Sequence, residues 1–233
     1  MGKPVCLIGG GRSFLDGINL GFWEKIKDKA EVWSLNFAFI FMPYLPSRQL
    51  WVDVTFFRNN MNQLEELSKK GVLMNAKSHM QYSNIKTIKQ YNVFKNIKEI
   101  HKFPDHIFDG QMGLVGLFAL SVAVKEEYSP IYLLGYDFGT GNVSNTNTHW
   151  YQEQKEEKHI NSYGIGNTKI YMQPNNVPSP MITDFEYYLK FTNKIYNVSS
   201  KNENNQFKTN ISYFKIINFE DFFKMIEDKN EPN

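Results

Sequence analysis

The chain is poor in cysteine, because Cys6 is the single thiol among its 233 residues. One thiol excludes an internal disulfide, which is typical of a protein in a reducing compartment. Its place in the first apolar run predicts that Cys6 is a small core residue. An excess of one charge is also lacking, since 26 Lys and Arg stand against 24 Asp and Glu. The formal net charge of +2 therefore gives no support to a nucleic-acid partner or an anionic membrane surface.

Long hydrophobic runs are missing from the sequence as well. The most apolar stretch, Leu114 to Val124, is shorter than the ~20 residues that cross a bilayer. The first residues pass directly into a short apolar run, without the longer hydrophobic region of a signal peptide. From these features we expect a cytoplasmic protein with no membrane span.

Hydrophobic residues make up 42% of the chain and aromatic residues 15%, which is enough for a sizeable core. Apolar strand-like runs alternate with helix-like patterns along the chain. This alternation predicts an α/β fold, a Rossmann-like and largely parallel sheet with helices on both faces. We expect one nucleotide-binding domain over residues 1–233. The expected strands are 5–8, 31–39, 49–54, 72–74, 131–137 and 194–198, with one or two short strands around 91–94 and 99–101 and a short strand or extended piece at 213–217. The expected helices are 14–28, 59–70, 111–127, 182–193 and 219–228.

A glycine-rich loop follows the first expected strand. Its residues are Gly9, Gly10, Gly11 and, after Arg12, Ser13, a candidate N-cap of the next helix. Glycines allow a ligand to approach the backbone closely, and free N–H groups at such a turn attract phosphate. The spacing is neither GxGxxG nor that of a P-loop. We interpret the loop as nucleotide-binding; the alternative is a tight turn without a ligand.

Polar residues also stand at the ends of three other expected strands: Asn36, Asp53 and Asp137. Ligands of parallel α/β sheets bind beyond the carboxyl ends of the strands, so we expect these side chains to converge on the glycine loop. If Asp53 and Asp137 end neighbouring strands, the two carboxylates could hold Mg²⁺ on a triphosphate. Either could instead bind a ribose hydroxyl or cap the next segment, and we favour a functional role for Asp53.

Residues 139–180 show little apolar periodicity and many Asn, Thr, Gly and Pro residues, a pattern that predicts a lid over the site. The lid would carry His149, Tyr151 and Tyr163. An imidazole suits general-base work near neutral pH, and tyrosine hydroxyls can stabilise a departing phosphate. The alternative to a lid is a disordered segment. The alternative to a catalytic His149 is an ordinary exposed histidine. The spacing of His and Cys residues gives no indication of a structural zinc site.

The ordered set of motifs resembles a known superfamily over most of the chain, apart from residues 75–108. The motifs are Gly9-Gly10-Gly11-Arg12-Ser13, Ser34-Leu35-Asn36, Trp51-Val52-Asp53, Ile131 to Phe138, and Lys194 to Ser199. This superfamily joins 6-hydroxymethylpterin pyrophosphokinase-like proteins, motility accessory factors and bacterial sialyltransferases, with small phage-encoded members.

The resemblance implies a transferase with an activated nucleotide donor, most closely a sialyltransferase-like glycosyltransferase that uses a CMP-sugar without a metal cofactor. Gly10, Gly11, Ser13 and Asn36 match the nucleotide site of that branch. Asp53 departs from it, because the sialyltransferase pattern has Asn there. No histidine matches the catalytic base securely; His149 and His159 are candidates only through their place in the lid.

Two alternatives stay open at this point. One is an ATP- and Mg²⁺-dependent pyrophosphokinase of the 6-hydroxymethylpterin type, in whose branch an acid tends to stand where Asp53 does. The other is a non-catalytic phage or surface-assembly factor that keeps the fold as a scaffold. A nucleotide or nucleotide-sugar donor is the expected partner of both enzyme hypotheses. None of these motifs encodes the acceptor or the oligomeric state.

Overall fold

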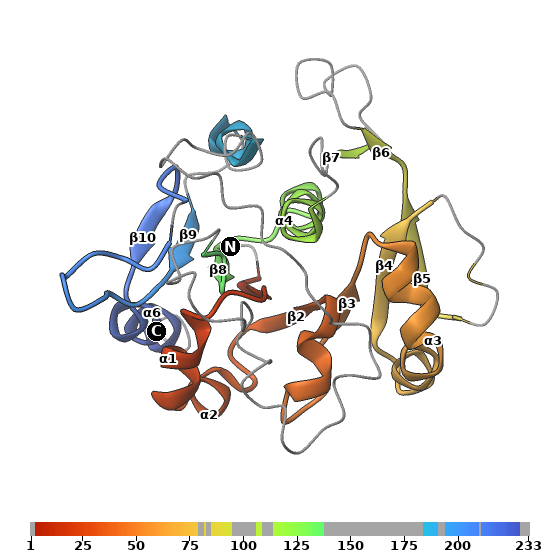
Figure 1. Cartoon of the computed structure of the whole chain (residues 1–233), viewed down its shortest axis with the longest axis horizontal. Helices are drawn as coiled ribbons and strands as arrows, with labels where there is room; N and C mark the ends of the chain where they lie inside the picture. The colour runs from red at the N-terminus through yellow and green to blue at the C-terminus, as the bar shows by residue number, and fades with distance from the viewer. Residues whose placement is uncertain are drawn as a thin grey trace.

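The computed structural model describes residues 3–78, 82, 85–94, 106–108, 114–137, 184–190, 194–209 and 211–228. An eight-stranded sheet of order β10-β9-β8-β1-β2-β3-β4-β5 crosses the molecule, and each of its strand pairs is parallel (Figure 1). Its strands are β1 (Val5–Ile8), β2 (Glu31–Leu35), β3 (Arg48–Leu50), β4 (Leu73–Lys77), β5 (Ile88–Tyr91), β8 (Ile131–Leu134), β9 (Ile195–Val198) and β10 (Lys215–Ile217). A separate parallel pair joins β6 (Val93–Phe94) to β7 (Ile107–Phe108).

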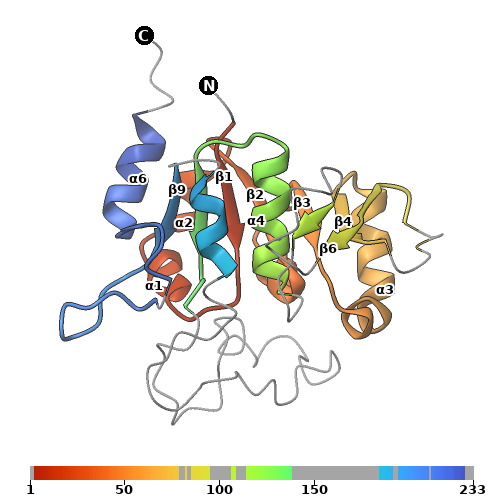
Figure 2. The same cartoon turned by 90° about the horizontal axis from the view of Figure 1, so that it is seen from above.

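Helices cover both faces of this sheet, as the alternating pattern predicts (Figures 1 and 2). One face carries α4 (Val115–Lys125) and the 3-10 helix η6 (Asp184–Lys190). The opposite face carries α1 (Phe14–Asn19), α2 (Phe22–Ile26), α3 (Val54–Lys69) and α6 (Phe219–Glu227). A 3-10 helix, η1 (Asn36–Phe41), links β2 to the loop before β3. The Rossmann-like α/β fold expected from the sequence is therefore confirmed. None of the helices in the described ranges is both long and apolar enough to cross a bilayer.

Helix α4 is the most deeply buried helix of the described structure. Its side chains from Leu117 to Ala123 are all buried, as expected for a helix that is apolar on every side. A Cβ on Gly116 would lie 2.8 Å from the ring of Tyr136, so this glycine lets α4 approach the sheet closely. The expected start of this helix, at residues 111–113, lies outside the described residues.

Several element boundaries differ from the sequence-based expectation. The helix expected over 14–28 is two helices, because Gly21 adopts φ 79° and breaks it. The strand expected to reach residue 39 ends at Leu35, since Asn36 takes a left-handed conformation with φ 50° and begins η1. The helix expected from residue 59 begins at Val54. The helix expected over 182–193 is described as the 3-10 helix η6.

The chain changes direction across the sheet between β1 and β8. From β1 it proceeds outward through β2, β3, β4 and β5, and later from β8 outward through β9 and β10 on the other side. The connections after β1 and β8 thus diverge at their carboxyl ends. In open parallel sheets such a switch point is where ligands bind. We call the sheet edge formed by the carboxyl ends of the strands the carboxyl edge.

A charged network centres on Arg48 and Glu126 toward the opposite edge, where β3 begins and α4 ends. The Arg48 guanidinium lies 2.5 Å from the Glu126 carboxylate and 4.4 Å from the centre of the Trp33 ring. Lys89 and the Tyr91 hydroxyl contact the other oxygen of Glu126 at 2.7 and 2.6 Å. These cationic and hydrogen-bonding partners lower the pKa of Glu126 to about 2 against the opposing effect of burial. The network ties β3, β5 and the end of α4 together.

Candidate functional site

The loops after β1 and β8 lie side by side at the switch point. The Gly9 amide donates to the Leu134 carbonyl, and the Gly11 amide to the Gly135 carbonyl, both at 2.8 Å. The two loops therefore extend the β1–β8 pairing past the ends of the strands. Gly135 adopts φ 68°, and a Cβ on it would lie 3.0 Å from the Gly11 backbone. Only residues without a side chain permit this close crossing.

Asp137, which lies in the loop after β8, contacts the end of the loop after β1 through its side chain. Its carboxylate accepts a hydrogen bond of 2.8 Å from the Ser13 amide and a second bond from the Ser13 hydroxyl. Ser13 was expected to cap the first helix through its own side chain, but its hydroxyl donates to Asp137 instead. The carboxylate thus satisfies an amide at the start of α1. The alternative that Asp137 caps the segment after it concerns residues outside the described ranges and stays a prediction.

Burial raises the pKa of Asp137 to about 6, although the Ser13 bonds and the nearby Lys208 charge act in the opposite direction. We expect the Asp137 carboxyl carbon to titrate with a midpoint near that value in ¹³C NMR. Ser13→Ala should move the midpoint upward, because the lost bond from the Ser13 hydroxyl favoured the ionised form. A midpoint near the ordinary 3.8 in the wild-type protein would contradict this geometry.

The glycine loop differs in one respect from the expected phosphate cradle. The amides of Gly9, Gly11 and Ser13 all donate to acceptors of the β8 side of the crossing. The carboxylate of Asp137 thus occupies the place expected for a bound phosphate at the start of α1. A ligand at this crossing would meet an intramolecular anion there, so the sugar or base of a nucleotide suits the position better than its phosphate.

Asn36 stands at the carboxyl end of β2, beside β1. Its left-handed backbone is held by Gln49, whose side-chain amide donates to the Asn36 carbonyl at 2.9 Å. The Asn36 side-chain oxygen is buried and has no hydrogen-bond partner in the described part of the chain. A buried acceptor without a donor costs about 1–3 kcal/mol. Strain and an unsatisfied acceptor at one residue are features that ligand sites tolerate, because the ligand can supply the missing donor.

Asp53 is exposed at the end of the segment after β3, where it precedes α3. Its side chain makes no capping hydrogen bond to that helix. The expectation that Asp53 and Asp137 end neighbouring strands is wrong, because β1 and β2 lie between β3 and β8. Three strand intervals of about 4.8 Å separate the two strands, too far for both acids to ligate one Mg²⁺ directly. Within the described ranges no cluster of three His, Cys, Asp or Glu side chains forms a metal site.

The segment between β9 and β10 forms part of this edge, although it was not among the residues predicted for the site. The Thr209 hydroxyl donates to the Tyr136 carbonyl at 2.8 Å, and Asn197 donates to Thr209 at the same distance. Lys208 pairs with Asp16 of α1 at 2.8 Å. The only sequence signal for this contact is the polar Asn197 within an otherwise apolar strand, which indicates a buried hydrogen-bond partner.

The structure thus brings together Gly9, Gly10, Gly11, Ser13 and Asp137 at the switch point, with Asn36 one strand away. Asp53 lies two strands from β1 on the same edge. His149, Tyr151 and Tyr163, and the expected lid over residues 139–180 as a whole, lie outside the described residues. Their proposed roles stay predictions from the sequence.

No family model matches the chain, and neither does any curated protein sequence. Among solved structures, the chain is similar to a variant of the sialyltransferase CST-II in complex with CMP. The two share 17% identity over 84% of this chain and 81% of that chain, with a TM-score of 0.41. This degree of similarity transfers neither a ligand nor a residue role, so the functional argument rests on the geometry of the switch point.

Proposed function

We propose that the protein is a transferase that binds an activated nucleotide donor, a nucleotide sugar of the CMP type, at the carboxyl edge beside β1. The observation that carries this proposal is the glycine crossing of β1 and β8 with the unsatisfied, strained Asn36 beside it. The amides and glycine faces of the crossing itself are taken up by the β8 loop and Asp137. Contact with a ligand therefore falls to Asn36 beside it, which offers an acceptor for an amino or hydroxyl group. These are the groups that a cytidine presents.

In the proposed reaction, an acceptor hydroxyl attacks the anomeric carbon of the donor sugar. The new carbon–oxygen bond forms as the bond from the sugar to the phosphate oxygen breaks, and the nucleoside phosphate leaves with the electron pair. A base must take the hydroxyl proton, and a donor must stabilise the departing phosphate. From the sequence we assign His149 to the first task and Tyr151 and Tyr163 to the second.

Titration of the protein with CMP, CTP and ATP tests the proposal. We expect CMP to bind in the micromolar range typical of substrates and to raise the melting temperature. Asn36→Ala should weaken CMP binding by about tenfold, because a hydrogen bond to a buried polar group is lost. Asn59→Ala, an exposed position on α3, is the matched control and should bind as the wild type does.

The metal dependence of binding and turnover separates the two enzyme hypotheses. A glycosyltransferase of this kind should keep CMP binding in EDTA. If ATP binds in preference to CMP and only with Mg²⁺, and Asp53→Asn abolishes that binding, the pyrophosphokinase hypothesis is correct instead. If none of the three nucleotides shifts the melting temperature, the proposal is wrong and the scaffold hypothesis gains support.

A further inference from the structure

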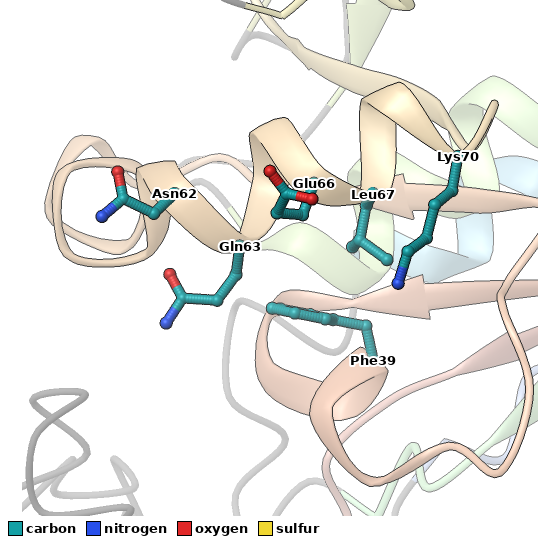
Figure 3. A pocket seen from close by; sticks show the side chains of 6 residues that line it. All are labelled: Phe39, Asn62, Gln63, Glu66, Leu67 and Lys70. Carbon is teal, nitrogen blue, oxygen red and sulfur yellow. The ribbon is translucent and has the colours of Figure 1, made fainter.

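A groove lies between η1 and α3, on the helical face adjacent to the candidate site (Figure 3). Its volume is about 310 Å³, and six residues line it: Phe39, Asn62, Gln63, Glu66, Leu67 and Lys70. The ring of Phe39 forms one wall, and side chains of α3 face it from the other side (Figure 3). From its lining we propose that this groove binds a pyranose ring of a glycan.

The two walls of the groove present apolar surfaces that complement the faces of a sugar ring. Phe39 is partly buried and packs against the Trp51 and Leu67 cluster, which holds its ring in place. An aromatic face carries partial negative charge, and the C–H groups on one side of a pyranose carry partial positive charge, so the two surfaces attract each other. Leu67 adds an aliphatic surface on the opposite wall. A sugar ring has just such apolar faces.

The rim of the groove supplies the polar contacts that sugar hydroxyls require. Asn62 and Gln63 each present a carboxamide that can both donate and accept, and neither has a hydrogen-bond partner in the part of the chain that is described. Glu66, whose carboxylate pairs with Lys69 at 2.6 Å, contributes an acceptor, and Lys70 contributes a donor at the same rim. The neutral amides favour a polyhydroxylated, uncharged ring over a phosphate.

The size and position of the groove support the same occupant. Small-molecule sites span about 300–1,000 Å³, so this volume suits a single ring rather than a whole nucleotide. Phe39 follows Asn36 by three residues in η1, which at about 2 Å per residue is a short distance along the helix. The Phe39 wall is therefore near Asn36, whereas Leu67 and Lys70, at the end of α3, lie toward the edge where β4 begins. A role of this sugar as the acceptor of the transfer reaction would rest on the proposed function, whereas its binding does not.

Saturation-transfer NMR with the methyl glycosides of glucose, galactose and N-acetylglucosamine tests the inference. We expect at least one of these probes to bind, with the strongest transfer to ring protons on one face of the sugar. Phe39→Leu keeps an apolar side chain but removes the aromatic face, and it should weaken that binding by about tenfold. Gln63→Ala should weaken it by about three- to tenfold through the lost hydrogen bonds.

Asn59 lies on the same helix outside the groove, so Asn59→Ala should leave glycoside binding unchanged. CMP should not displace the glycoside, and Asn36→Ala should leave glycoside binding intact, so this inference and the proposed function can fail separately. Absence of binding by all three glycosides, binding that Phe39→Leu and Gln63→Ala leave unaltered, or displacement by CMP would each overturn the assignment.

Discussion

Replacement of Gly11 by alanine should abolish CMP binding and destabilise the fold by about 3 kcal/mol, at the upper end of overpacking penalties. A Cβ on Gly11 would lie 2.5 Å from the carboxyl carbon of Asp137 and 2.6 and 2.7 Å from its oxygens. Asp137 cannot move aside without loss of its bonds to Ser13. The Gly11 amide is held by the Gly135 carbonyl, so the backbone cannot withdraw either. Urea denaturation and CMP titration measure the two effects.

Gly71→Ala is the control, because Gly71 has open space around its Cβ position and differs from Gly11 in its φ of 86°. It should cost only about 1 kcal/mol of left-handed strain and leave CMP binding unchanged. Asp137→Ala in the Gly11→Ala background should recover part of the lost stability, because the clashing group is removed. Wild-type stability and affinity in the Gly11→Ala protein would show that the two loops do not cross as described.

The second large effect concerns the network at the opposite edge of the sheet. Arg48→Met should destabilise the protein at pH 7 by about 3 kcal/mol, since the Glu126 carboxylate loses its guanidinium partner while it stays largely buried. The pKa of Glu126 is about 2 in the fold and 4.5 ordinarily, so its ionised form stabilises the fold above pH 4.5. That stability, about 3 kcal/mol, should disappear as the pH falls from 4.5 toward 2.

Urea denaturation between pH 7 and pH 2.5 measures this dependence. Glu126→Gln should flatten the acid limb of the stability profile, because the titrating group is gone. Lys69→Met removes an ion pair of similar length whose two side chains are exposed, and it should leave the stability unchanged. A Glu126→Gln profile that still falls as steeply as the wild type would assign the acid sensitivity to other carboxylates.

The sequence was sufficient for the architecture because hydrophobic burial determines it. The apolar runs that become β1 and β8 are buried on both faces, which distinguishes central parallel strands from exposed ones. Helix α4 was recognisable as buried for the same reason. Element ends were predicted less well, because they depend on single residues. Asn36 ends β2 through a left-handed backbone conformation that no local periodicity reveals.

The candidate site was predictable in its residue types and less so in its contacts. Glycines at the carboxyl end of the first strand indicated a close approach, but not that the partner is the Gly135 loop rather than a ligand. Likewise Asp137 looked like a ligand-binding acid, whereas its carboxylate accepts from Ser13, 124 residues earlier in the chain. Strand order decides such contacts. The same order separates Asp53 from Asp137, and composition and spacing do not encode it.

Chemical-shift mapping of the ¹⁵N-labelled protein with CMP shows directly whether the switch point binds a nucleotide. We expect the largest amide shifts at residues 10–12, at Asn36 and at Gly135, all at the carboxyl edge around the switch point. Amides of the Arg48–Glu126 network at the other edge should stay unshifted. Shifts confined to that opposite edge, or an unchanged spectrum at saturating CMP, would contradict the assignment of the switch point as a nucleotide site.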